Sequence, residues 1–188
     1  LAWVLLSLSY HGHATALTST DQQSETLRAL IEKLEDSHYV DRRYNDAMSR
    51  EHLNSYLERL DPSHLYFTAR DIADFDRLAT VLDDQGRKGN VTASFEIFNR
   101  YEAIAGARLD EVIDTMDVRV GGFDFEVDEF SVSDPTERDW AVSTAEPDDR
   151  WRKRTKNHVL GLTLADQAPH DLPPHLTKRF GDQRSRLA

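Results

Sequence analysis

Apolar residues recur at intervals of three and four over most of the chain, a spacing that is typical of amphipathic helices. The pattern predicts five helices, over residues 20–39, 45–60, 68–83, 91–117 and 149–164. It also allows a short helix over residues 174–180. We therefore predict a mainly α fold, a helical bundle-like domain of about five helices packed around a shared core.

Each predicted helix has an apolar face. The residues expected there are Leu27, Leu30, Ile31 and Leu34; Met48, Leu53, Tyr56, Leu57 and Leu60; Phe95, Phe98, Tyr101, Ile104, Ala105, Val112, Ile113 and Met116; and Trp151, Val159, Leu160 and Leu164. Thr20 has a side chain suited to the N-cap of the first helix. Gly106, inside the longest helix, predicts either a close approach of another helix or a local bend.

The stretch from Leu60 to Leu78 contains the clearest helix end and helix start in the sequence. Pro62 lacks an amide donor and keeps Asp61 out of the α region, so a helix must end just before it. Thr68 is a good N-cap for the next helix, with Asp71 as its capping-box partner. A turn therefore joins two helices here.

Three apolar residues, Leu65, Tyr66 and Phe67, lie inside this turn. An exposed loop does not normally carry such a group, because its apolar surface would face water. We therefore predict that the turn folds inward and holds the two helices together. Ser63 is explained as a turn residue beside Pro62.

The spacing of apolar residues changes after Gly121. Phe123, Phe125 and Val127 alternate with acidic residues, as in a short half-buried strand, so we predict one extended or strand segment near residues 123–128. Residues 131–149 then resemble a linker, with Trp140 as the residue that contacts the helices.

The net charge of −11 is unevenly distributed. Residues 151–188 carry eight basic and three acidic side chains, whereas the first 150 residues carry 15 basic and 31 acidic ones. An acidic body repels phosphate, so we predict no nucleic-acid partner.

A basic cluster occupies the first half of the predicted 149–164 helix: Arg150, Arg152, Lys153, Arg154 and Lys156. Positive charge is unfavourable at a helix N-terminus. These side chains are therefore expected to have acidic neighbours, with an ordinary solvated face as the alternative.

The first 16 residues, LAWVLLSLSYHGHATA, join an apolar run to an A-x-A pattern at Ala14–Ala16. These are the features of a secretory signal peptide, here without its basic start, and the apolar run is shorter than the roughly 20 residues of a membrane span. We predict export, with no stable membrane insertion after cleavage. A buried N-terminal helix is the alternative.

No pattern identifies a catalytic, cofactor-binding or metal site, and we predict none of the three in this chain. There is no cysteine, which excludes disulfides and thiolate metal sites. His11 and His13 lie in the segment expected to be removed, and the remaining histidines lack metal-binding spacings. No serine stands in a nucleophile motif.

Two stretches resemble a known family. The run LNSYLERLDPSHLYFTARDIADF, residues 53–75, is similar to the N-terminal region of the tail-specific proteases, the periplasmic branch of the C-terminal processing peptidases. FDFEVDEF, residues 123–130, and DDRWRKRTKNHVLGLTL, residues 148–164, resemble it more weakly. Neither stretch is a catalytic motif. The resemblance places most of residues 20–164 in that family's helical N-terminal domain.

The resemblance implies a scaffold in a periplasmic serine endopeptidase that recognises the C-termini of exported proteins. Its Ser and Lys dyad would lie after residue 188. The expected partners are the PDZ and protease domains of the full-length chain, protein substrates and a helical adaptor protein. The alternative is a stand-alone exported helical binding module without enzymatic activity.

We accordingly divide the chain into four parts. Residues 1–16 are a truncated signal peptide, 17–120 the helical N-terminal domain, 121–148 an extended segment and linker, and 149–188 a helical segment that leads toward PDZ and protease domains missing from the chain.

Overall fold

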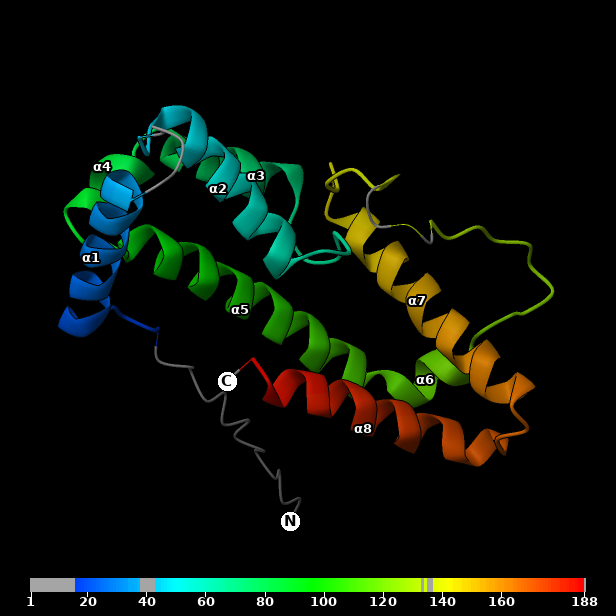
Figure 1. Cartoon of the computed structure of the whole chain (residues 1–188). Helices are drawn as coiled ribbons and strands as arrows, with labels where there is room; N and C mark the ends of the chain where they lie inside the picture. The colour runs from blue at the N-terminus through cyan, green and yellow to red at the C-terminus, as the bar shows by residue number, and fades with distance from the viewer. Residues whose placement is uncertain (1–15, 38–42, 133, 135–136, 188) are drawn as a thin grey trace, which may run out of the picture.

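A computed structural model describes residues 16–37, 43–132, 134 and 137–187 of the chain. Within them the fold is helical, with eight α-helices where about five were predicted and with no β-strand (Figure 1). The helices are α1 (Asp21–Ser37), α2 (Asp46–Leu60), α3 (Ala69–Phe75), α4 (Leu82–Arg87), α5 (Thr92–Asp114), α6 (Met116–Gly121), α7 (Ala145–Leu164) and α8 (Leu172–Ser185).

Helix α5 runs through the molecule and connects its two ends (Figure 1). Helices α1 to α4 lie around its N-terminal half, and α8 lies along its C-terminal half. Helix α7 begins near the turn after α2 and runs toward α6. None of the helices in the described ranges has both the length and the hydropathy that crossing a membrane requires.

The core consists of two apolar clusters. The first contains Leu65, Tyr66, Ala105, Leu109, Val112, Met116, Trp151, Val159, Leu172, Leu176 and Phe180. The second contains Leu53, Leu57, Phe67, Phe75, Leu78, Ala79, Ala93 and Ile97. Tyr101 and Ile104 of α5 pack against both.

The turn after α2 joins the two clusters, which confirms its predicted role. Leu65 and Tyr66 are buried in the first cluster, and the adjacent Phe67 is buried in the second. Thr68 caps α3 with the predicted capping box, in which Asp71 is the partner. The turn therefore fixes α2 and α3 against α5 and α7.

The predicted helix over residues 68–83 is divided, because the chain tightens into a 3-10 turn at Asp76–Leu78 before α4 begins. The tightening places Leu78 and Ala79 together in the core. The predicted helix over residues 91–117 also divides. Thr115 Oγ1 donates to the carbonyl of Glu111 at 2.7 Å, a bond that bends helices, and α6 begins at the next residue.

Helices α7 and α8 begin earlier than predicted, and prolines occupy their first turns. Helix α7 begins at Ala145 with Pro147 in its first turn, and α8 begins at Leu172 with Pro173 and Pro174 in its own. A first-turn residue has no intrahelical acceptor for its N–H, so proline is tolerated there. Helix α8 consequently extends well beyond the short helix predicted over residues 174–180.

The predicted strand near residues 123–128 is wrong. Among the described residues this segment forms no ladder with another strand, although Phe125 and Val127 are about half exposed, at 44% and 51%. An isolated parallel bridge instead joins Thr68 to Ala141. An alternating segment forms a stable strand only when a second strand supplies hydrogen bonds, and the described residues contain no such strand.

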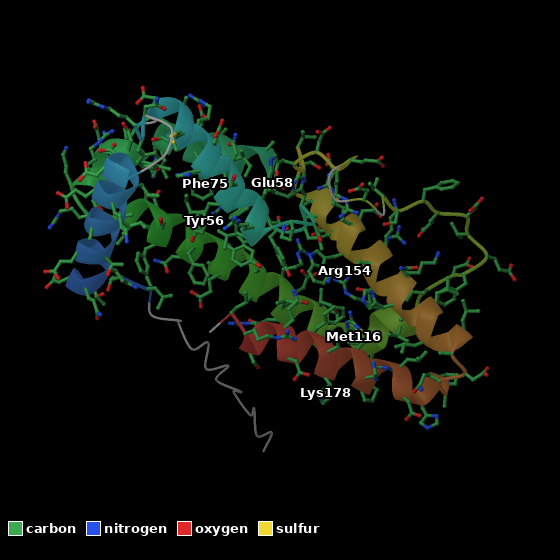
Figure 2. All side chains as sticks on the ribbon, viewed as in Figure 1. Tyr56, Glu58, Phe75, Met116, Arg154 and Lys178 are labelled. Carbon is green, nitrogen blue, oxygen red and sulfur yellow. The ribbon has the colours of Figure 1, made fainter. Side chains whose placement is uncertain are left out.

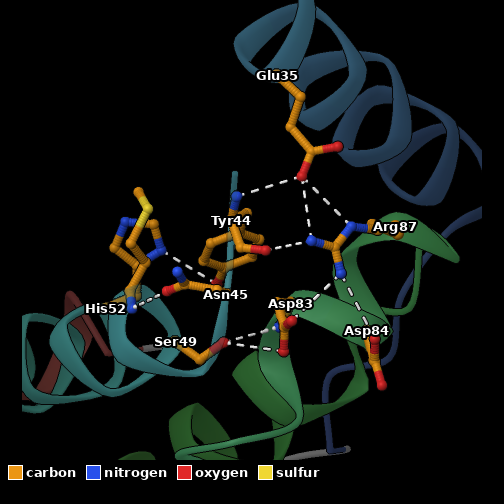
Figure 3. A network of polar contacts seen from close by, with 9 residues as sticks. Glu35, Tyr44, Asn45, Ser49, His52, Asp83, Asp84 and Arg87 are labelled. Carbon is orange, nitrogen blue, oxygen red and sulfur yellow. Dashed lines mark hydrogen bonds and ion pairs between the residues drawn. The ribbon is translucent and has the colours of Figure 1, made fainter. Parts of the chain in front are cut away.

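Helix α1 is held mainly by polar contacts, and its predicted apolar face is partly wrong. Ile31 is buried, whereas Leu30 and Leu34 are both 51% exposed. The Arg87 guanidinium of α4 donates to Glu35 of α1 at 3.1 Å and to Asp83 at 3.2 Å (Figure 3). Asp83 in turn accepts from Ser49 of α2 at 3.2 Å, so one network joins three helices.

Gly106 marks a close approach between helices, which was one of its two predicted roles. A Cβ atom at this position would lie 3.2 Å from the Arg184 guanidinium carbon of α8, and α5 continues unbroken through the glycine.

Candidate docking groove

The turn after α2 is built around the carboxylate of Asp61, which is fully buried. Its oxygens accept hydrogen bonds from the amides of Leu65, Tyr66 and Phe67 at 2.8, 2.8 and 2.9 Å. Burial raises the pKa of Asp61, and the three amide donors and the nearby His64 oppose that rise. One side chain thus shapes the whole turn.

His64 connects this turn to the segment before α7. Its backbone has a left-handed φ of 47°, and its ring stacks on Trp140 with centroids 3.6 Å apart. Nε2 lies 2.9 Å from Glu58 Oε2, and Nδ1 lies against the Arg138 carbonyl. The two ring nitrogens thus contact α2 through Glu58 and the segment before α7 through Arg138. The predicted contact of Trp140 with the helices is confirmed.

Helix α7 is fastened to the same turn through the turn's carbonyl groups. Arg150 donates to the His64 carbonyl at 2.7 Å, and Trp151 Nε1 donates to the Leu65 carbonyl at 3.2 Å. Arg138 donates to the Ser63 carbonyl at 2.6 Å. The turn therefore sets the position of α7.

The predicted acidic neighbours are present for four of the five residues in the basic cluster on α7, whereas Arg154 pairs with no carboxylate in the described part of the chain. Arg152 pairs with Glu129 at 3.0 Å and with Asp149 at 2.8 Å, and Lys153 pairs with Asp149 at 2.8 Å. Hydrogen bonds from Arg152, and then from Lys156, hold the pKa of Glu129 below its usual value. These pairs hold residues 125–132 beside α7.

A groove of about 980 Å³ lies between α7 and residues 125–132, and Ser63 and Leu65 of the turn also line it. Its apolar lining includes Phe130, which is 83% exposed, and Leu160, which is 39% exposed. Within the described part of the chain, no main-chain ladder pairs residues 128–132 with another segment. The groove thus offers apolar side chains beside a main chain that pairs with no strand among the described residues.

The groove lining has five basic side chains, among them Arg138 and Arg154, against three carboxylates. Arg138 lines it and donates to the carbonyls of Ser63 and Val132. Arg154 lines it as well and lies over the Trp151 ring, 4.9 Å from its centroid. Burial lowers the pKa of both arginines, and repulsion from other arginines adds to the effect. The sequence singled out Arg154 as part of the basic cluster but contained no signal for Arg138.

Ser63 lies in the turn, as predicted. No three His, Asp or Glu side chains converge in a metal-binding arrangement among residues that the structure describes. The predicted signal peptide, apart from Ala16, and the His11 and His13 pair fall outside those residues, as do His38 and Tyr39.

Comparison with known proteins agrees with the sequence resemblance. The model of the tail specific protease N-terminal domain family matches residues 30–188. The tail-specific protease of Haemophilus influenzae is 29% identical over 177 residues, which cover 90% of this chain and 24% of that protein. The chain thus spans about a quarter of the length of this curated relative.

Proposed function

The chain belongs to the tail-specific protease N-terminal domain family, and on that premise we propose that it is the non-catalytic scaffold and docking domain of a periplasmic serine endopeptidase. The catalytic Ser and Lys are proposed to lie elsewhere in the full-length protease, beside a PDZ domain. The substrates are proposed to be exported proteins recognised by their C-termini, with a helical adaptor protein as a second partner.

The groove beside α7 is the observation that supports a docking role. Exposed apolar side chains, such as Phe130 and Leu160, lie beside main-chain groups that have no partner strand among the described residues. An extended peptide binds such a site through main-chain hydrogen bonds and alternate side chains. The groove therefore fits an extended segment of a protein substrate.

Proteolysis assays test this proposal with an exported protein that ends in an apolar tail. We expect cleavage by the full-length protease and none by this chain alone. Replacing Phe130 and Leu160 by Asp in the full-length protease is expected to raise KM about tenfold with kcat unchanged. The reason is that docking stabilises the bound substrate and the transition state equally.

The matched control is Val142→Asp, which changes an 82% exposed apolar residue that does not line the groove. Its KM should equal that of the wild-type protease. Cleavage by this chain alone would contradict the non-catalytic role, and an unchanged KM in the groove variant would contradict docking there.

Export is tested by fusing the N-terminal part of the full-length protease, up to residue 30 of this chain, to an alkaline phosphatase that is active only outside the cytoplasm. We expect phosphatase activity, and mass spectrometry should find Leu17 as the first residue of the exported product. An inactive fusion, or a product that retains residues 1–16, would contradict the proposed signal peptide.

A further inference from the structure

A second hollow lies between α7 and α8 and shares Arg154 with the docking groove. It has a volume of about 620 Å³. Its lining comes from α5, α7, α8 and the residues after α8: Tyr101, Arg154, His175, Lys178, Arg179, Asp182, Gln183, Arg186 and Leu187. Figure 2 shows two of these side chains, Arg154 on α7 and Lys178 on α8. The hollow thus lies where the two helices face each other across α5.

The charges around this hollow are strongly unbalanced. Its lining has four Lys or Arg side chains and His175, against the single carboxylate of Asp182. That carboxylate is already paired with Lys178 at 2.9 Å. In the described part of the chain, no carboxylate forms an ion pair with Arg154 or Arg179.

The unpaired cations repel one another. Burial lowers the pKa of Arg154 and the charge of Arg179 lowers it further, while Tyr66, Asp61 and Tyr101 act in the opposite direction. Burial also lowers the pKa of His158, and both arginines add to that effect against a hydrogen bond to the Arg154 carbonyl. Like charges brought together without a counterion destabilise the folded state.

An anion would remove this repulsion. Arginine presents a planar fork of donors that matches phosphate and carboxylate oxygens. The partly buried Arg154 also lies in a less polar environment than water, where a charge-assisted hydrogen bond is stronger. Surface lysines alone would not provide these features.

We propose that the hollow between α7 and α8 is a binding site for a compact group of negatively charged oxygens, with Arg154 and Arg179 as its main ligands. Free phosphate carries such a group, and so do adjacent glutamates of an acidic peptide. Lys178, Arg186 and His175 surround the site and set its positive charge.

Thermal unfolding of the 188-residue chain tests the site with two probes, inorganic phosphate and a tetraglutamate peptide, each at matched ionic strength against sodium chloride. At ten times its Kd, a bound anion is expected to raise Tm by about 3 to 5 °C. A rise with phosphate alone identifies free phosphate as the source, and a larger rise with tetraglutamate identifies an acidic peptide. No rise with either probe would overturn the proposal.

Variants separate binding at this hollow from a general salt effect. Arg154→Gln and Arg179→Glu should each abolish most of the rise, and Arg179 is exposed, so its variant should fold normally. Arg50→Gln, at an exposed arginine of α2 outside the hollow, should retain the full rise. Equal rises in all three variants would overturn the proposal.

The same variants provide a readout without any anion. Because Arg179 repels Arg154, Arg179→Glu is expected to have an unchanged or higher Tm than the wild-type chain when no anion is present. A residue with a purely structural role would show a lower Tm, and that result would also overturn the proposal.

Discussion

The Asp61 carboxylate accepts hydrogen bonds from three consecutive amides, and the geometry of the central turn depends on them. The local sequence explains why the helix stops here, since Pro62 follows. It does not explain why an ionisable side chain is fully buried. The three backbone amides explain this burial, because their hydrogen bonds replace those to water that the carboxylate loses on folding.

Replacing Asp61 by Asn should destabilise the chain by about 3 kcal/mol. The Asn side chain keeps one acceptor oxygen, but its NH2 group replaces the second oxygen and would face the backbone N–H groups of the turn. Urea denaturation followed by circular dichroism measures the change. Asp74→Asn, at an exposed carboxylate of α3, is the control and should shift the midpoint little. Equal midpoints for the two variants would show that the buried hydrogen bonds contribute nothing.

Asp71 links the capping box to α5. Burial alone would raise its pKa, but hydrogen bonds from the backbone and side chain of Thr68, together with Arg100, outweigh it and hold the pKa below its usual value. Arg100 donates to the carboxylate at 2.7 and 3.1 Å. A lowered folded-state pKa means that ionised Asp71 stabilises the fold.

This stabilisation is expected above the unfolded-state pKa of about 3.9 and should be lost as the pH falls through the folded-state pKa. Asp71→Asn should therefore be less stable than wild type by about 1 to 2 kcal/mol at pH 7, and the gap should narrow near pH 2. Urea midpoints at both pH values provide the measurement. A gap that widens on acidification would contradict the direction of the pKa shift.

At the scale of elements, the joint between α4 and α5 depends on a glycine. Gly89 has a φ of 71°, and a Cβ atom there would lie 2.5 Å from the Ser24 carbonyl oxygen of α1. Gly161 in α7 instead has open space around it, since a Cβ atom there would meet no atom within 4 Å. The two glycines therefore respond differently to the same substitution.

Gly89→Ala should destabilise the chain by about 1 to 2 kcal/mol, because an L side chain is strained at this φ and meets backbone. Gly161→Ala should instead stabilise it by about 0.5 to 1 kcal/mol through helix propensity. Thermal melts of both variants compare the two directly. A stabilised Gly89→Ala variant would contradict the tight contact between α1 and the α4–α5 joint.

At the scale of the whole molecule, the two apolar clusters should unfold together, because Tyr101 and Ile104 belong to both. Phe180→Ala removes a fully buried ring of α8 from the first cluster and should cost about 3 to 4 kcal/mol. Tryptophan fluorescence and circular dichroism should give coincident urea transitions in wild type and variant.

The control is Leu164→Ala, at a side chain that is 76% exposed, which should change stability by less than about 0.5 kcal/mol. Transitions that separate, with fluorescence and circular dichroism reporting different midpoints, would show that the clusters fold independently. The central turn would then not couple the two ends of the molecule.

The features determined by the sequence itself are those that arise from neighbouring residues. Pro62 ends α2, Thr68 and Asp71 cap α3, and the spacing of apolar residues on α2 predicts the burial of Leu53 and Leu57. These effects act over one or two helical turns, so the local pattern contains their cause. The family resemblance rests on the same local stretches.

Only the tertiary structure decided the features that depend on residues far apart in the chain. The alternation at residues 123–128 predicted a strand, but no partner strand lies beside it among the described residues. Arg138 reaches the groove, and Arg154 meets Arg179, only because α7 packs against the turn and α8. Pairing, burial and charge balance are properties of elements brought together in space, and a one-dimensional pattern does not contain those distances.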